Sequence, residues 1–278
     1  MTVALSLGNL GLSEESTSEL SAEQTVRIGA TVDATTVPGA GEGLPLLWHW
    51  AHFTPTAATS DLGADGHPRL PDGPLAQYPR RMWASGTVEA LGQLVVGEPA
   101  TRRSQVVEAR ESDGRSGALM IVRVQHRYSQ FDADQIVEEQ TLVYRTPGPP
   151  VPMPAGDHQP EVGPDRWQER HTPNTATLFR FSAVTFNSHR IHYDRPYATG
   201  IEGYPALVVH GPLSAVLVGE SFRRRFGREL SRFEFRANAP LFVDLPFTIV
   251  ANSGPPLEAE VFRNDGVQAM AVAATLTQ

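Results

Sequence analysis

The stretch Val208-Val-His-Gly-Pro-Leu-Ser-Ala-Val-Leu-Val-Gly-Glu-Ser-Phe-Arg-Arg-Arg-Phe226 passes from an apolar run into a helical pattern. Pro212 suits the first turn of a helix, where its missing amide hydrogen is not needed. The residues after it are mainly apolar or small, which is typical of a helix buried at the centre of a domain. We therefore predict a central helix from about Pro212 to Phe226, with Gly211 at its entrance.

Strand signals follow this helix and also dominate the middle of the first half. Runs rich in Val and Ile, separated by turn residues, predict antiparallel strands. The runs are 88–91, 104–109, 118–128 and 136–144, and then 233–237, 247–252, 257–263 and 267–275. With a further helix expected at 19–28, each half is predicted to be one helix against a curling antiparallel sheet, an α+β architecture. Two unrelated α+β modules remain an alternative.

A proline-rich segment divides the chain near its middle. Five prolines fall within the nine residues 146–154, and such a density prevents a helix or a central strand. We predict an N-terminal domain over 1–146, a linker over 147–165 and a C-terminal domain over 166–278.

Composition excludes several classes of chemistry. The chain of 278 residues has no cysteine, and all 23 of its basic residues are arginine. Disulfides, thiolate metal sites and Schiff-base or P-loop lysine chemistry are therefore ruled out. The net charge of −8 argues against a nucleic-acid partner. Without a signal sequence or a long apolar stretch, we expect a soluble cytoplasmic protein with no membrane partner.

Polar functional groups gather in the segment 187–194. It contains Asn187, His189, Arg190, His192 and Asp194, too much polarity for a packed strand unless the groups face a cleft. Histidine exchanges protons near neutral pH, and a neighbouring amide or carboxylate can fix its tautomer. This segment is therefore the candidate catalytic site.

The free amide of Gly211 gives the predicted central helix a second role. Amides at a helix N-terminus carry partial positive charge and can bind a carbonyl oxygen that becomes an enolate. Glycine at this position lets a substrate approach the backbone closely.

Together, Asn187-Ser-His-Arg-Ile-His-Tyr-Asp194 and His210-Gly-Pro-Leu213 resemble the hydratase 2, or MaoC-like, enoyl thioester hydratases of the hot-dog fold. The resemblance is nearest to the branch of the mitochondrial-type 3-hydroxyacyl-thioester dehydratases and the bacterial mesaconyl-C4-CoA and 3-methylfumaryl-CoA hydratases. In the first half it is carried by 44–50, 80–83 and 138–145. It implies a double hot dog, with a degenerate N-terminal half that helps to form the acyl pocket and a catalytic C-terminal half.

The family motif also implies roles for individual residues. The general pattern Asp-x-Asn-Pro-x-His-x-Asp matches Asn187, His192 and Asp194, but Thr185 stands where the first Asp belongs, and two extra residues separate the Asn from the His. We expect His192 to be the base toward water, Asn187 to position the water and the Gly211 amide to hold the thioester oxygen. Asp194 would orient a histidine or the loop, or would transfer a proton. His189 is the alternative candidate for the base.

Substrate-binding roles are predicted for Thr185, Tyr193, Arg190, Trp48 and His210. Arg190 is a candidate for binding a second substrate carboxylate, with a surface position or a pair with Asp194 as the alternative. Trp48, His49 and Trp50 are candidates for the wall of the acyl pocket, with plain packing as the alternative. His210 either contacts substrate or braces the loop before the helix. The run 223–225 either meets CoA phosphates or is a solvated helix end.

The predicted function is reversible hydration of an α,β-unsaturated acyl-CoA, favouring a C4 branched dicarboxylic substrate such as mesaconyl-C4-CoA or 3-methylfumaryl-CoA. No metal or other cofactor is expected beyond the CoA of the substrate. Alternatives are a 3-hydroxyacyl-thioester dehydratase of fatty-acid synthesis, a thioesterase and a non-catalytic acyl-thioester binding module. A homodimer is plausible, although edge-to-edge pairing of the two halves within one chain is an alternative to it.

Overall fold

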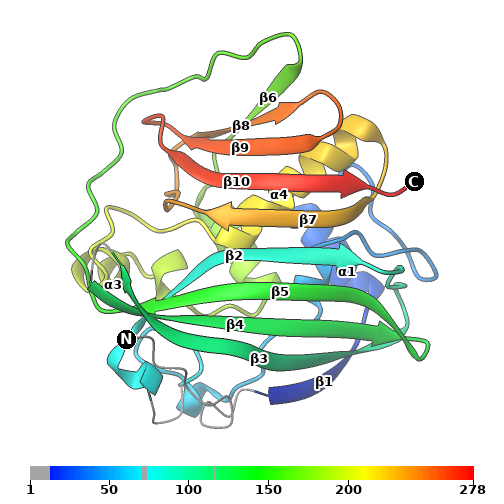
Figure 1. The fold of residues 1–278 in the computed structure, drawn as a ribbon, viewed down its shortest axis with the longest axis horizontal. Coiled ribbons are helices and arrows are strands. Elements are labelled where there is room, and N and C mark those ends of the chain that lie inside the picture. The colour runs from blue at the N-terminus through cyan, green and yellow to red at the C-terminus, as the bar shows by residue number, and fades with distance from the viewer. Residues whose placement is uncertain (1–12, 70–73, 115–116) are drawn as a thin grey trace.

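Ten antiparallel strands form one continuous sheet (Figure 1). The computed structural model describes residues 13–69, 74–114 and 117–278. The spatial order of the strands is β1-β3-β4-β5-β2-β7-β10-β9-β8-β6. Their bounds are β1 Ser13–Glu19, β2 Arg80–Ala90, β3 Pro99–Gly114, β4 Gly117–Gln130, β5 Ala133–Arg145, β6 Arg166–His171, β7 Leu230–Ala237, β8 Phe247–Asn252, β9 Leu257–Arg263 and β10 Gln268–Leu276.

The first half of the chain supplies β1 to β5 and the second half supplies β6 to β10. The two groups meet where β2 pairs with β7, in register from Ser85 opposite Arg236 to Glu89 opposite Arg232. The sequence predicts one antiparallel sheet in each half, with edge-to-edge pairing of the halves as an alternative to a dimer. The structure shows this edge-to-edge pairing within the chain. This pairing satisfies the backbone groups of two edges that would otherwise be open.

Helices pack behind this sheet (Figure 1). Within the described ranges, the α-helices are α1 Ala22–Thr31, α2 Thr175–Val184, α3 Arg195–Gly200 and α4 Gly211–Phe226. Ser21 caps α1 by accepting a hydrogen bond from the Gln24 amide, and Gly227 ends α4 with a φ of 62°, a conformation that favours glycine. No helix in the described ranges has the length and apolar character needed to cross a bilayer.

The helix α4 is the centre of the main hydrophobic core. All of its residues from Leu213 to Phe222 are buried, and the core around it includes side chains from both halves, such as Ile28, Trp48 and Phe233. The predicted central helix is therefore confirmed. Its one buried acid, Glu220, accepts hydrogen bonds from Trp48 of the first half and from Arg223 one turn further along the helix.

Between the two groups of strands, residues 146–165 form neither helix nor strand. This segment is held against the second half at several points. The Val151 amide donates to the Gly203 carbonyl, and the Asn264 side chain donates to the carbonyls of Pro154 and Gly156.

Four helices and strands of the described ranges were not predicted from the sequence: α2, α3 and the two outermost strands, β1 and β6. Both strands are rich in polar and charged residues. The strand β1 pairs with β3, where Glu14 and Glu15 form ion pairs with Arg102 and Arg103. Charged strands at the two ends of a sheet discourage further pairing, so their polarity fits their position.

A buried carboxylate organises the interior of the first half. Glu138 accepts hydrogen bonds from Trp50 (2.9 Å), Tyr128 (2.7 Å) and Gln140 (2.6 Å), and His49 Nε2 lies 3.2 Å from it. Burial alone would raise the pKa of Glu138, but the hydrogen bond and charge of His49 and the other polar contacts lower it to about 2. The side chain is therefore ionised at neutral pH.

We predict that Glu138→Ala lowers the free energy of unfolding by about 3–5 kcal/mol, because it leaves several buried donors without their acceptor. Urea denaturation followed by tryptophan fluorescence measures the loss. The neighbouring Glu139→Ala is the matched control, because Glu139 is 40% exposed and pairs only at the surface with Arg123. Equal midpoints for the two variants would contradict the prediction.

Candidate active site

A cavity of about 550 Å³ lies between the two halves. It is lined by residues on loops and strands of the first half and by the segment around 185–192 and the start of α4 in the second half. The polar and aromatic side chains that matter most below are Trp50, His67, Arg81, Trp83, Asn187, His189 and His192.

His192 has a fixed orientation in this cavity. It ends a short 3₁₀ turn, Arg190–His192, and its Nδ1 donates a hydrogen bond of 2.7 Å to the Val208 carbonyl. Because the carbonyl only accepts, the proton is on Nδ1 and the lone pair is on Nε2. Burial lowers the pKa of His192 to about 4, so the ring is neutral at neutral pH and can accept a proton.

His210 supports the ring of His192 from behind. The two imidazoles stack with their centroids 3.6 Å apart, and His210 Nε2 lies 2.8 Å from the Ser182 hydroxyl. His210 is buried and does not line the cavity. Of the two roles weighed for it, the structure places it in the bracing position.

Gly211 stands at the N-terminus of α4 and lines the same cavity. Among the described residues, none accepts a hydrogen bond from its amide. A Cβ at this position would lie 2.6 Å from the indole ring of Trp83, which stacks on Phe235. The residue must therefore be glycine for the aromatic wall to approach, and its amide remains available to a ligand oxygen.

Asn187 and Thr185 also line the cavity but differ in what they can do. The Asn187 Oδ1 accepts a hydrogen bond from the His189 amide at 3.0 Å, which leaves its Nδ2 group free to point at a ligand. The Thr185 hydroxyl donates to the Phe181 carbonyl at 2.6 Å, at the end of α2. Its proton is thus already used, and Thr185 does not replace the acid of the family motif.

His189 meets residues that the sequence analysis did not select. Its ring lies 4.1 Å from that of His67, which comes from a loop of the first half, and His67 Nδ1 lies 3.0 Å from Asp65 Oδ2. Burial, together with the neighbouring histidines and Arg81, strongly lowers the pKa of His189. One donor atom from each of Asp65, His67 and His189 lies within 4.8 Å of the others, so this is the cluster that a metal ion could use.

Asp194 and Arg190 lie outside the lining of the cavity. Asp194 caps α3 by accepting a hydrogen bond from the Tyr197 amide, and it binds the Arg190 guanidinium at 2.7 Å. That guanidinium also lies 4.2 Å from the Tyr197 ring. The structure therefore shows the ion pair that was the alternative to a substrate-binding Arg190, and it places Asp194 in a capping role.

Trp48 differs most from its predicted position. It is 1% exposed, donates its indole hydrogen to Glu220 and is not part of the cavity wall. Its neighbour Trp50 lines the cavity instead, perpendicular to Trp83. A four-residue 3₁₀ turn, Trp48–Ala51, points the two indoles in different directions.

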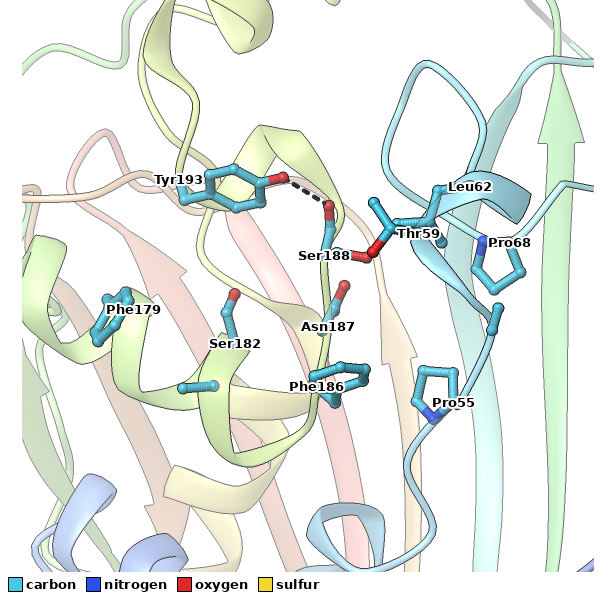
Figure 2. A pocket seen from close by; sticks show the side chains of 12 residues that line it. Pro55, Thr59, Leu62, Pro68, Phe179, Ser182, Phe186, Asn187, Ser188 and Tyr193 are labelled. Atoms are coloured by element: carbon cyan, nitrogen blue, oxygen red, sulfur yellow. Dashed lines mark hydrogen bonds between the residues drawn. The ribbon is translucent and has the colours of Figure 1, made fainter.

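A smaller cavity of about 370 Å³ adjoins the first and is mainly apolar (Figure 2). Pro55, Leu62 and Pro68 of the first half lie opposite Phe179 and Phe186. The predicted substrate-binding residue Tyr193 is in this wall, and its hydroxyl donates to the Ser188 carbonyl. The two cavities share lining residues, namely Pro55, Pro68, Asn187 and Ser188.

The arginines at the end of α4 are engaged within the chain. Arg223 pairs with Glu220 and Glu229, and Arg224 pairs with Glu169. This arrangement agrees with a helix end stabilised by its own ion pairs rather than with a site prepared for phosphates.

Comparison with known proteins identifies the family. The model for "hydroxyacyl-thioester dehydratase type 2" matches residues 47–243. The chain belongs to this family. Its relatives include the mesaconyl-C(4)-CoA hydratase of Chloroflexus aurantiacus, 41% identical over 96% of each chain. The mitochondrial hydroxyacyl-thioester dehydratase type 2 of Schizosaccharomyces pombe is 26% identical over 78% of this chain and 81% of its own. As a member of this family, the chain is an enzyme of the hydratase/dehydratase type, a hydro-lyase.

Solved structures confirm the fold of this family member. A MaoC-like dehydratase from Phytophthora capsici covers 99% of each chain with a TM-score of 0.68 at 15% identity. A conserved Mycobacterium tuberculosis protein described as a double hot dog covers 99% of this chain and 98% of its own, with a TM-score of 0.61 at 12% identity. The predicted double hot dog is thus confirmed.

Sequence reasoning missed His67, Arg81 and Trp83, which line the cavity, and Asp65, which lies behind His67. An acid and a histidine two positions apart in a loop rich in Gly and Pro were the available signal, because loops on a rigid scaffold often carry function. Nothing in the sequence indicated that this loop would reach a segment about 120 residues away.

Proposed function

We propose that this protein catalyses the reversible hydration of an α,β-unsaturated acyl-CoA, with a C4 branched dicarboxylic enoyl-CoA as its substrate, namely mesaconyl-C4-CoA, which is called 3-methylfumaryl-CoA when numbered from the thioester. The observation that carries the proposal is the neutral His192, whose Nε2 shares one cavity with the free Gly211 amide. The near full-length similarity to a mesaconyl-C(4)-CoA hydratase supports the choice of substrate.

These residues divide the reaction between them. His192 Nε2 accepts a proton from water as the hydroxyl adds to the β-carbon, and Asn187 holds that water through its side-chain amide. The electrons of the double bond move toward the thioester, whose oxygen becomes an enolate bound by the Gly211 amide. A proton then reaches the α-carbon and completes the addition.

The second carboxylate of such a substrate is attached to the β-carbon, so its binding group must lie beside the water-activating histidine. Arg81 lines the cavity and lies close enough to lower the pKa of both His67 and His189. Within the described ranges it forms no ion pair with a carboxylate. We assign to Arg81 the role first considered for Arg190, because Arg190 is neutralised by Asp194.

The smaller apolar cavity fits the pantetheine arm of the thioester. Pro55 and Phe186 line it, and it shares Asn187 with the larger cavity that contains Gly211, so an arm lying there would direct the thioester toward Gly211. The proposal requires no metal or redox cofactor. We also propose that the protein is cytoplasmic and forms a homodimer.

The first test follows the ultraviolet absorbance of the conjugated enoyl thioester, with thiol release monitored in parallel. We expect mesaconyl-C4-CoA to lose the band without release of thiol and faster than crotonyl-CoA. His192→Gln lowers kcat/KM by about 10²–10⁴-fold, while the exposed His158→Gln is unchanged. Faster loss with crotonyl-CoA would favour the fatty-acyl dehydratase, thiol release would indicate a thioesterase, and no turnover would contradict the proposal.

The pH dependence tests the buried state of His192. Since the base must be neutral and its pKa is about 4 rather than 6.5, kcat/KM should stay level from pH 7 to about 5 and fall below that. An acid limb centred near 6.5 would contradict the prediction. Fluorescence at each pH is the control for unfolding. The pKa values of His52 and His192 are about 4 in the folded chain and 6.5 in the unfolded chain, so the unfolded chain binds more protons and stability declines as the pH falls from about 6.5 through 4.

Substrate selectivity tests Arg81. We predict that Arg81→Met lowers kcat/KM for mesaconyl-C4-CoA by about ten- to a hundredfold, as expected for a lost charged hydrogen bond of about 1.5–3 kcal/mol. The rate with crotonyl-CoA, which lacks the carboxylate, should change little. Arg190→Met is the comparison variant. If kcat/KM for mesaconyl-C4-CoA falls selectively in Arg190→Met and not in Arg81→Met, the group that binds the carboxylate is Arg190 and the assignment to Arg81 is wrong.

A further inference from the structure

A loop of the first half is fastened onto the catalytic segment of the second half. The Arg190 amide donates to the Asp65 carbonyl at 2.8 Å, the Arg190 Nη1 donates to the Ala64 carbonyl at 2.9 Å, and the Ser188 hydroxyl donates to the Gly66 carbonyl. Gly66 has a φ of 88°, and a Cβ on it would lie 1.9 Å from the Ser188 carbonyl oxygen. The close approach thus depends on a glycine between Asp65 and His67.

The clamped loop presents an oriented histidine to the cavity. Asp65 Oδ1 accepts a hydrogen bond from the His67 amide at 3.0 Å, and Oδ2 lies 3.0 Å from His67 Nδ1. Because a carboxylate accepts, Nδ1 carries the proton and Nε2 is the nitrogen left to exchange one. His67 lines the cavity, whereas Asp65 does not. A histidine oriented by a carboxylate behind it is the arrangement of a general base.

His67 lies in the same cavity as His192, with His189 near both. The ring of His67 lies 4.1 Å from that of His189, and His189 lies 5.4 Å from His192 in an edge-on arrangement. The position at which the family motif has an acid is occupied by Thr185, whose hydroxyl is bound to Phe181. His67, His189 and His192 all line the cavity, so they lie where they could transfer the proton that the motif segment, without its acid, cannot.

We propose that His67, oriented by Asp65, is a second catalytic histidine of the hydration, which exchanges the proton at the α-carbon while His192 exchanges the proton of water. The inference rests on the proposed function.

The protons balance with all three histidines neutral at the start. His192 takes a proton from water as the C–O bond forms, and the enolate oxygen is held by Gly211. The proton then passes across the cavity to His67, whose imidazolium is stabilised by Asp65, and His67 delivers it to the α-carbon as the C–H bond forms. All three histidines end neutral, and the net change is the addition of one water. Dehydration follows the same steps in reverse.

A metal ion is the competing use of this cluster. Two observations favour proton transfer: Asp65 is already hydrogen-bonded to His67 through both oxygens, and Arg81 is near enough for its charge to lower the pKa of both His67 and His189. A divalent cation placed there would be repelled by the guanidinium.

The test separates the two proton transfers in the full-length protein. The α-proton of the 3-hydroxyacyl thioester is followed by NMR for exchange in D₂O, and hydration is followed by absorbance. We expect His67→Gln to lose exchange and to lower kcat at least a hundredfold with little change in KM. His192→Gln loses hydration but keeps exchange. Asp65→Asn, which preserves shape, lowers both rates at least tenfold, and the exposed His158→Gln lowers neither.

Exchange that persists in His67→Gln overturns the inference. If the His67 and Asp65 variants both lose hydration and exchange and also unfold at a lower temperature, the pair is structural and the inference is likewise overturned. Wild-type activity lost to a chelator and restored by Zn²⁺ overturns it in favour of a metal. Failure of the wild type to hydrate either enoyl-CoA would instead overturn the proposed function, so the two failures are distinguishable.

Discussion

The pairing of β2 with β7 brings together the residues of the two halves that form the candidate active site. Each half is an incomplete site by itself: the second half carries His192 and Gly211, and the first carries His67, Arg81 and Trp83. Five aligned residue pairs along this seam fix the two halves in register. A slip of one residue would turn the side chains of β2 to the opposite face of the sheet, so Trp83 would leave the cavity and Gly211.

Burial of α4 is the second constraint, and it sets the electrostatics of the site. The helix lies in the shared core, so its N-terminus opens into the cavity between the two halves. Burial beside this helix removes water from His192 and His210, and desolvation is the first cause of their lowered pKa values. The burial of α4 therefore accounts for both the unpaired Gly211 amide and the neutral His192, because both depend on low solvent access.

How much the sequence predicts depends on whether a feature is local. The strands β8 and β9 match their predicted ranges, since alternating apolar residues and the turn at 264–266 define them. The strand β1 was missed because its stability comes from pairing with β3 rather than from its own polar residues. Likewise His192 and Asn187 share one short motif and were found, whereas His67 reaches them only through contacts across more than 100 residues.

The distribution of charge explains why the two halves are both needed for a charged substrate. Histidines in the cavity are neutral because burial opposes a second positive charge beside Arg81. A dicarboxylic thioester that places its carboxylate on Arg81 neutralises that charge, and so makes a proton on His67 or His189 less unfavourable. Binding of this substrate would then prepare the histidines for the proton they must carry.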